Sequence, residues 1–114
     1  KPEIKKGFIS ELCQRTGLQY FVATLPAAYA TELDPTGKRL PRSVVQKILL
    51  IRALVHKPSL LIMEEPWQGI EEEYRHSIQD LILNATDTTV VVATTDEGFS
   101  KRCNQIIQCD FKNQ

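Results

Sequence analysis

Hydrophobic residues recur along this chain at two different spacings, and the change of spacing separates predicted helices from predicted strands. Spacings of three and four residues predict two short helices between Glu3 and Ala23, interrupted at Thr16-Gly17, and longer helices over Ser43–Val55 and Ile70–Asn84. Continuous or alternating apolar runs predict strands over Leu60–Met63, Thr89–Thr94 and Gln105–Phe111. For the sheet portion the predicted order is strand, helix, strand, helix, strand, where the second helix is the connection between the last two strands. This order predicts an α/β fold with a parallel sheet and right-handed crossovers.

Three segments carry more specific expectations. The helix over Ser43–Val55 is apolar around most of its circumference, so we expect it to be buried. The unbroken apolar run Leu60–Met63 is typical of a central parallel strand that is covered on both faces. The segment Leu25–Pro41 contains three prolines and the turn cluster Asp34-Pro35-Thr36-Gly37, which predicts an irregular loop.

Composition narrows the class of protein. The 114 residues are enough for one folding unit, and 14 basic residues balance 14 acidic ones, as in an ordinary soluble globular protein. The absence of a basic excess argues against a nucleic-acid partner. No apolar run approaches the roughly 18 to 20 residues that span a bilayer, so we expect any link to a membrane to run through missing sequence or a partner.

The cysteines and histidines do not form a recognisable metal or disulfide pattern. Cys13, Cys103 and Cys109 are odd in number and lack Cys-x-x-Cys spacing, which predicts reduced thiols and neither a disulfide framework nor a zinc site. His56 and His76 are isolated from plausible co-ligands, so we expect them to be surface residues.

A candidate site follows from the way the predicted strands end. One strand ends in Glu64-Glu65 and its expected neighbour in Thr94-Thr95-Asp96. Ligands of parallel sheets bind beyond the carboxyl ends of the strands, so these five residues define the site. Paired carboxylates there are typical of phosphoryl transfer, in which one serves the magnesium shell and one orients water. The alternative is a capped strand end with solvated acids.

The order and spacing of several segments resemble the nucleotide-binding domain of ATP-binding-cassette (ABC) transporters. These segments are Arg52-Ala53-Leu54, the break at Pro58, the run from Leu60 to Pro66 and the stretch that ends at Glu71. The resemblance extends upstream, where the segment from Leu25 to Leu33, followed by Gly37 and Leu40, is similar to the region before the signature motif of exporters. It implies a P-loop NTPase-like sheet over residues 43–114, the C-terminal half of the ATPase core, preceded by a small helical subdomain and signature loop over residues 1–42.

The resemblance also implies roles for the residues at the strand ends. Glu65 matches the catalytic glutamate that polarises the attacking water. Glu64 stands where the family has an aspartate that holds magnesium through water, and its extra methylene displaces the carboxylate. Thr95 occupies the position of the switch histidine that contacts the γ-phosphate. The sole tryptophan, Trp67, is either a contact at a domain or dimer surface or a simple core residue.

The signature motif and the loop after the carboxylates also differ from the family pattern. Leu40-Pro41-Arg42-Ser43-Val44 stands in place of Leu-Ser-Gly-Gly-Gln, so Arg42 and Ser43 are the implied contacts to the partner domain's nucleotide. The alternative for Arg42 is a solvated side chain on a capped helix. Gln68 and Glu71 belong to the loop that, in the family, connects the two nucleotide sites of a dimer.

No Gly-x-x-x-x-Gly-Lys-[Ser/Thr] phosphate loop occurs in these residues, so the resemblance places that loop upstream and the chain alone is expected to bind no cofactor. In such domains the earlier strands lie among the later ones, so we expect an isolated fragment to expose sheet edges and apolar faces unless other residues cover them. The full domain is expected to bind ATP and magnesium, to pair with a second nucleotide-binding domain, and to act with a transmembrane domain or subunit at the cytoplasmic side of a membrane. The predicted function is coupling of ATP binding, with weak hydrolysis, to export. The alternatives are a regulatory or scaffold module that has lost catalysis, and an unrelated α/β protein.

Overall fold

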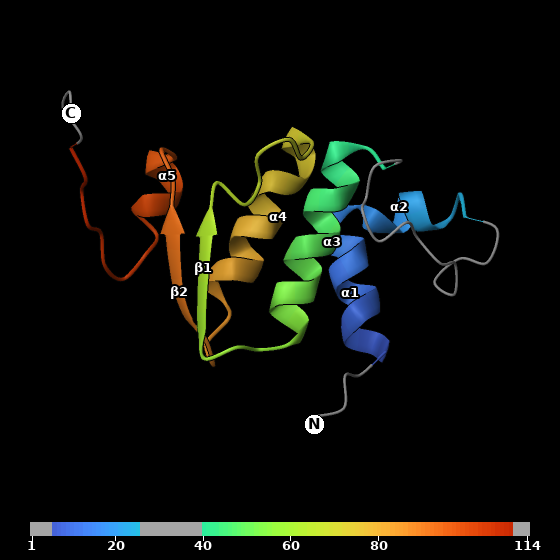
Figure 1. Cartoon of the computed structure of the whole chain (residues 1–114), viewed down its shortest axis with the longest axis horizontal. Coiled ribbons are helices and arrows are strands. Elements are labelled where there is room, and N and C mark those ends of the chain that lie inside the picture. The colour runs from blue at the N-terminus through green and yellow to red at the C-terminus, as the bar shows by residue number, and fades with distance from the viewer. Residues whose placement is uncertain (1–5, 26–39, 111–114) are drawn as a thin grey trace.

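The computed structural model describes residues 6–25 and 40–110 of the chain. In chain order the elements are helices α1 (Lys6–Thr16), α2 (Leu18–Val22) and α3 (Arg42–Val55), strand β1 (Leu60–Glu64), helix α4 (Glu72–Leu83), strand β2 (Thr89–Ala93) and the short helix α5 (Glu97–Ser100). The helices α1, α3 and α4 stand side by side next to the sheet (Figure 1). The described residues therefore form a small α/β domain.

The two strands pair in parallel, as the sequence predicts. Leu60 lies opposite Thr89 and Glu64 opposite Ala93, and α4 connects the two strands. Both strands are rich in apolar residues, and the β-branched valines of β2 favour extended backbone. Consequently the carboxyl ends of both strands lie at the same end of the molecule (Figure 1).

The core lies between one face of this sheet and the helices. Leu12 of α1, Ile78 of α4 and Phe99 of α5 are almost completely buried in it. The side chains of β1 and β2 that pack against this core are Leu61, Met63, Val90 and Val92. The helices and one side of the sheet thus share a single core, as expected for layered α/β domains.

The break between the first two helices falls at Gly17, as predicted. Gly17 has a φ of 81°, in the left-handed region that glycine adopts without strain. The hydroxyl of Thr16 donates to the carbonyl of Leu12 at 2.8 Å, which satisfies that polar group inside the core. This arrangement lets α1 and α2 both contact α3.

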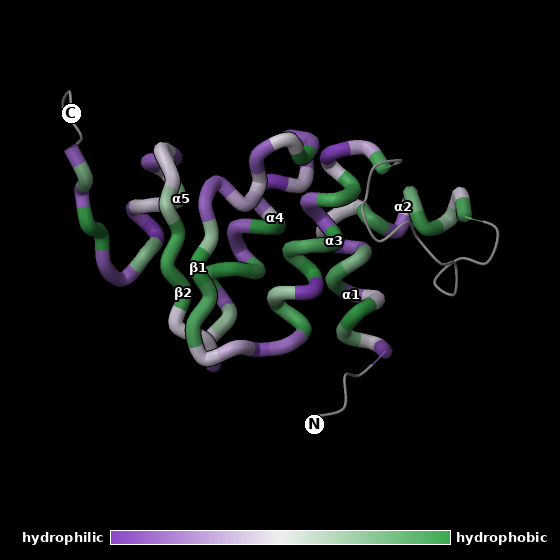
Figure 2. Tube along the Cα trace, in the orientation of Figure 1, coloured by the Kyte–Doolittle hydropathy of each residue, from purple (hydrophilic) through white to green (hydrophobic). Residues whose placement is uncertain are grey.

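The expected strand over Gln105–Phe111 is wrong for the residues that the structure describes. Residues 105–110 have no strand conformation and run outside the sheet, while Phe111 lies outside the described residues (Figure 1). This segment does carry apolar residues, and hydrophobic colour is visible along the C-terminal tail in Figure 2. Its Ile106 and Ile107 are both exposed. A strand also needs a neighbour for its backbone N–H and C=O groups, and this segment pairs with none of the described strands.

One expectation about burial is wrong and another is confirmed. α3 is buried along one face only, because Leu49 on the other face is half exposed. The sheet keeps an open apolar face, as expected for a fragment, and Ile62 of β1 on that face is 70% exposed. In the described residues no element packs against that face of the sheet. Residues 26–39 of the predicted irregular loop lie outside the described residues.

Candidate functional site at the carboxyl ends of the strands

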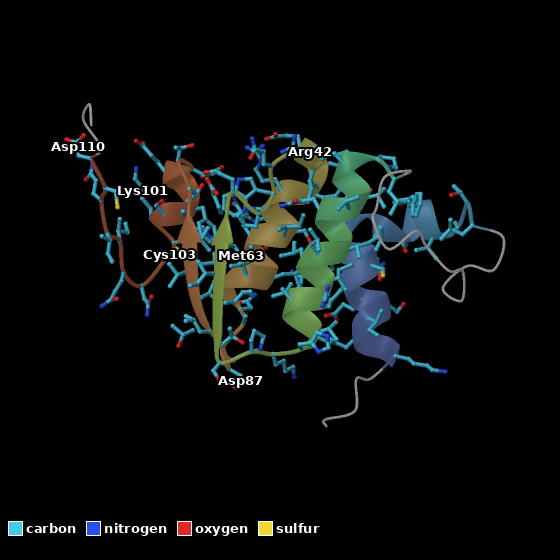
Figure 3. The ribbon with its side chains drawn as sticks, in the orientation of Figure 1. Arg42, Met63, Asp87, Lys101, Cys103 and Asp110 are labelled. Atoms are coloured by element: carbon cyan, nitrogen blue, oxygen red, sulfur yellow. The ribbon has the colours of Figure 1, made fainter. Side chains whose placement is uncertain are left out.

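The residues singled out from the sequence fall at one end of the molecule. Both strands point towards this end, and α3 and α4 begin there (Figure 1). Figure 3 places Arg42 at this end and Asp87 at the opposite one. The structure brings together at this end the strand-terminal residues, the start of α3 and the loop before α4: Glu64, Glu65, Thr95, Arg42, Ser43, Gln68 and Glu71.

Glu65 and Thr95 are in direct contact. The backbone N–H of Glu65 donates to the carbonyl of Ala93 at 2.9 Å, which extends the parallel ladder by one residue. The backbone N–H of Thr95 donates to Oε1 of Glu65 at 2.6 Å. The two strand ends converge as the sequence predicts, and the Glu65 carboxylate is positioned by a backbone amide rather than by the side chain of residue 95.

The backbone at Glu65 is unusual. Its φ is 41°, in the left-handed region that residues with a Cβ seldom adopt. Conformations of this kind cost on the order of 1 to 3 kcal/mol and persist only where the surroundings hold them. Here the carbonyl of Glu65 accepts a bond of 2.9 Å from the backbone N–H of Gln68, which closes a tight turn directly after β1.

Residues 65–71, called the carboxylate loop below, connect β1 to α4. The side-chain amide of Gln46 donates to the carbonyl of Pro66 at 2.9 Å, so α3 holds the start of this loop. Gly69 has a φ of 83°, and a Cβ at that position would lie 3.8 Å from the side chain of Arg42. The exposed Arg42 therefore packs beside the carboxylate loop.

Trp67 anchors the carboxylate loop in the core. It is 2% exposed, and its ring centroid lies 4.8 Å from that of Phe99 with the planes tilted by 57°. This geometry is a common one for favourable aromatic pairs. Of the two readings that the sequence left open, the core role is confirmed.

The other predicted residues keep more contact with solvent. Glu64 ends β1 and is exposed, as is Gln68 in the carboxylate loop, while Ser43 in the first turn of α3 is half-buried. Glu64 and Gln68 are therefore accessible to a ligand at this end of the sheet. Within residues 6–25 and 40–110 no cluster of three or more metal-binding side chains occurs.

Glu71 is paired with a residue that the sequence analysis missed. Nζ of Lys47, on the buried face of α3, lies 2.9 Å from Oε1 of Glu71, and the lysine is only 3% exposed. The hydrogen bond from Lys47 is the main cause that lowers the pKa of Glu71 below its ordinary value. A signal was present in the sequence, because Lys47 interrupts the apolar face formed by Val44, Ile51 and Leu54.

Asp96, the last of the five residues at the strand ends, caps α5. Its carboxylate accepts hydrogen bonds from the backbone N–H of Phe99 at 2.9 Å and from the side-chain amide of Gln79 at 3.1 Å. The bond from Phe99 is the main reason that the pKa of Asp96 is lowered, while burial acts in the opposite direction. Asp96 is therefore neither a free ligand nor a solvated acid, because its carboxylate is engaged in capping α5.

Comparison with known proteins gives three informative relatives. A multidrug efflux ATP-binding/permease protein of Mycobacterium bovis is 33% identical over 95 residues, which make up 82% of this chain and 8% of that protein. The ABC-type transporter kk1G of Curvularia clavata is 32% identical over 74% of this chain and 6% of its own length. The ABC multidrug transporter mdr4 of Aspergillus fumigatus is 30% identical over 90% of this chain and 7% of its own length. No protein-family model matches the chain.

The chain resembles a segment of ABC transporters. It spans less than a tenth of the length of each of these ABC transporter relatives. Among the described residues, no helix has the length and apolar character required to cross a bilayer.

Proposed function

We propose that this chain is part of the nucleotide-binding domain of an ABC exporter and contributes one edge of an ATP site. The observation that carries the proposal is the contact between Glu65 and Thr95 at the carboxyl ends of two parallel strands. The place where such strands end is where ligands of open α/β sheets bind. Similarity to named multidrug transporters over most of the chain supports the same assignment. The proposal includes a P-loop NTPase-like fold for the complete domain.

Glu65 is the proposed residue that orients and polarises the attacking water. Its carboxylate has one oxygen engaged by the Thr95 amide, which fixes its direction and leaves the other oxygen to orient a water molecule. The side chain of Thr95 is exposed beside it and supplies one short hydroxyl donor towards a terminal phosphate. Because a hydroxyl is neutral and short, we expect weaker hydrolysis than with a longer, cationic side chain.

The carboxylates at the end of β1 fit a magnesium ion that arrives with a nucleotide. Magnesium is commonly held by one or two carboxylates together with phosphates and water, and it neutralises charge on the transferred phosphoryl group. Glu64 is exposed and directly precedes Glu65, so its oxygens are available to such an ion, directly or through water.

Arg42 and Ser43 are proposed to face the nucleotide of a second nucleotide-binding domain. They begin α3, whose amino end carries a partial positive charge, and Arg42 adds a guanidinium that can bind phosphate oxygens. Gln68, which is exposed, and Glu71 would lie at the same contact. The remaining partner in this proposal is a transmembrane domain or subunit, through which the chain acts at the cytoplasmic side of a membrane.

The test compares nucleotide turnover by the full-length protein with two matched variants. Glu65→Gln keeps the shape of the side chain but removes the carboxylate, so we expect hydrolysis to fall by on the order of a hundredfold while ATP binding persists. Glu11→Gln, which changes an exposed glutamate of α1, is the control and should leave turnover unchanged.

Binding to the 114-residue chain is a separate test. Since these residues contain no phosphate loop, calorimetric titration should detect no magnesium-ATP binding tighter than about 1 mM. Micromolar binding by this chain, or an unchanged rate in Glu65→Gln, would show that the site lies elsewhere. Loss of nucleotide binding in the full-length protein would leave a scaffold role as the better description.

A further inference from the structure

Lys47 is a buried lysine, and a buried ammonium group requires compensating partners. It is 3% exposed on the face of α3 that packs into the core, next to Val44, Leu50 and Ile51. Burying an ammonium group away from water is unfavourable unless the charge is paired and hydrogen-bonded. Two partners provide that compensation: Oε1 of Glu71 at 2.9 Å, and the face of the Tyr74 ring, whose centroid is 4.8 Å from Nζ.

These partners connect Lys47 to the end of the carboxylate loop. Glu71 is the last residue of that loop and the N-cap residue of α4, and Tyr74 lies in the first turn of that helix. The neighbouring residue of α3, Gln46, bonds the carbonyl of Pro66 near the start of the loop at 2.9 Å. Two consecutive residues of α3 thus hold the carboxylate loop near both of its ends.

Tyr74 extends the same contact to the first two helices. Its ring lies against Gly17, where a Cβ would come within 2.4 Å of the ring. The ring therefore has a fixed position between the α1–α2 junction and the ammonium group of Lys47. A cation held against a fixed ring and a carboxylate has little freedom, so its position is well defined.

We propose that Lys47 is a positioning residue, which holds the carboxylate loop and thereby sets the position of the Glu65 carboxylate relative to the amino end of α3. This inference rests on the proposed function, in which the carboxylate loop is part of an ATP site. Lys47 itself touches neither Glu65 nor Thr95; it acts through Glu71. Glu71 is accordingly committed to this pair, and it is not a free ligand for a nucleotide.

The pair is asymmetric, and this asymmetry allows a sharp test. The side chain of Glu71 is 49% exposed, whereas that of Lys47 is 4% exposed. Lys47→Met leaves a solvated carboxylate and an apolar side chain in an apolar place, so the core stays packed while the loop loses its restraint. Glu71→Gln leaves a buried ammonium with a weaker acceptor and is the more disruptive change.

The experiment measures amide hydrogen-exchange rates and chemical shifts of the carboxylate loop by NMR on the ¹⁵N-labelled chain. In Lys47→Met, hydrogen exchange of the Gln68 and Ile70 amides, which are bonded inside the loop, should speed up at least about tenfold, the effect of losing one charge-assisted hydrogen bond. The amide of Thr95 should shift as its bond to Glu65 loosens. Lys47→Arg, which restores the charge, should recover most of both changes.

The matched control is Lys57→Met. Lys57 is also placed over an aromatic ring, that of Phe8 at 5.6 Å, but it is exposed and lies on the connection from α3 to β1. Its replacement should leave the Gln68, Ile70 and Thr95 amides unchanged. If Lys47→Met fails to fold, Lys47→Gln, which keeps a polar side chain but no charge, is read in its place, with the same acceleration expected.

Wild-type exchange rates and an unshifted Thr95 amide in folded Lys47→Met or Lys47→Gln would overturn the inference. These readouts need no nucleotide. A chain whose loop loosens in Lys47→Met, while the full-length protein neither binds nor hydrolyses ATP, would therefore refute the proposed function and leave the positioning role in place. In a full-length protein that hydrolyses ATP, Lys47→Met should lower kcat with little change in KM.

Discussion

Thr95 and Glu65 are thirty residues apart in the sequence and are joined by a hydrogen bond of 2.6 Å from a backbone N–H to a carboxylate oxygen. Because the donor belongs to the backbone, the side chain at position 95 can change without loss of this contact. A substitution at residue 95 therefore tests the chemistry of that side chain without moving the Glu65 carboxylate.

We expect Glu64→Asp combined with Thr95→His to raise ATP hydrolysis by the full-length protein. The shorter carboxylate and the longer, chargeable side chain would each recover about 1.4 kcal/mol of transition-state stabilisation, or up to about a hundredfold if the two are additive. Steady-state turnover is the measurement. A matched pair of changes at exposed residues away from the site, Glu11→Asp with Thr86→His, should have no effect. A wild-type rate within roughly 1 to 1,000 per second that the double substitution leaves unchanged would contradict this prediction.

Trp67→Ala should strongly destabilise the fold. The tryptophan is 2% exposed and stacks against Phe99, so its removal leaves a cavity that the surrounding residues cannot fill. Substitutions of this kind cost about 3 to 5 kcal/mol. Urea unfolding measures the loss, with Tyr20→Ala, which removes an aromatic ring that is 65% exposed, as the comparison. Equal effects of the two substitutions would show that Trp67 is not a core residue.

Two glycines in the same region should respond to alanine in opposite ways. Gly17→Ala places a Cβ within 2.4 Å of the Tyr74 ring at a φ of 81°, which should cost about 2 kcal/mol or more. Gly7 lies in α1 with nothing within 4 Å of an added Cβ, so Gly7→Ala should be neutral or stabilise the fold by up to about 1 kcal/mol. Thermal unfolding of both variants checks the difference, and a stable Gly17→Ala protein would contradict the contact with Tyr74.

The contribution of Asp96 to stability should depend on pH in one direction. The hydrogen bond from Phe99 lowers the pKa of Asp96 in the folded state, so its ionised form stabilises the fold above the unfolded value of about 3.9. That contribution should be lost as the pH falls through the lower folded pKa. The difference in unfolding free energy between wild type and Asp96→Asn should therefore be constant from about pH 7 to 5 and shrink below about pH 4.

This comparison isolates Asp96 from other carboxylates. The pKa values of Glu71 and Asp80 are also lowered, chiefly by hydrogen bonds from Lys47 and Arg102, and both contribute to the acid sensitivity of wild type. They are present in both proteins, so their effects cancel in the difference. A difference that stays constant down to about pH 2.5 would show that the charge of Asp96 plays no part in the cap.

The sequence predicted the parts of the fold that depend on local pattern. The apolar run that ends in Glu64-Glu65 and the β-branched run before Thr94 were sufficient to predict two parallel strands with Glu65 and Thr95 at one edge. Pattern could not decide whether residues 105–110 find a partner strand, since pairing depends on which edge is available in space.

The ion pair at Lys47 shows a different limit. The spacing of Val44, Lys47 and Ile51 places the lysine on a buried face, but it does not identify the carboxylate that compensates its charge. Glu71, Glu72 and Glu73 are all within one turn of sequence, and only the path of the carboxylate loop selects Glu71. Long-range charge pairing of this kind requires coordinates.

The left-handed backbone at Glu65 means that the residue best for fold stability differs from the residue that supplies the carboxylate. Glycine would adopt a φ of 41° without strain, so Glu65→Gly relaxes the turn after β1 but deletes the carboxylate that Thr95 holds. Selection for fold stability alone would favour glycine or asparagine at this position. Glu65→Gly should therefore raise the free energy of unfolding while it removes the carboxylate, so the backbone and the side chain of this residue favour different amino acids.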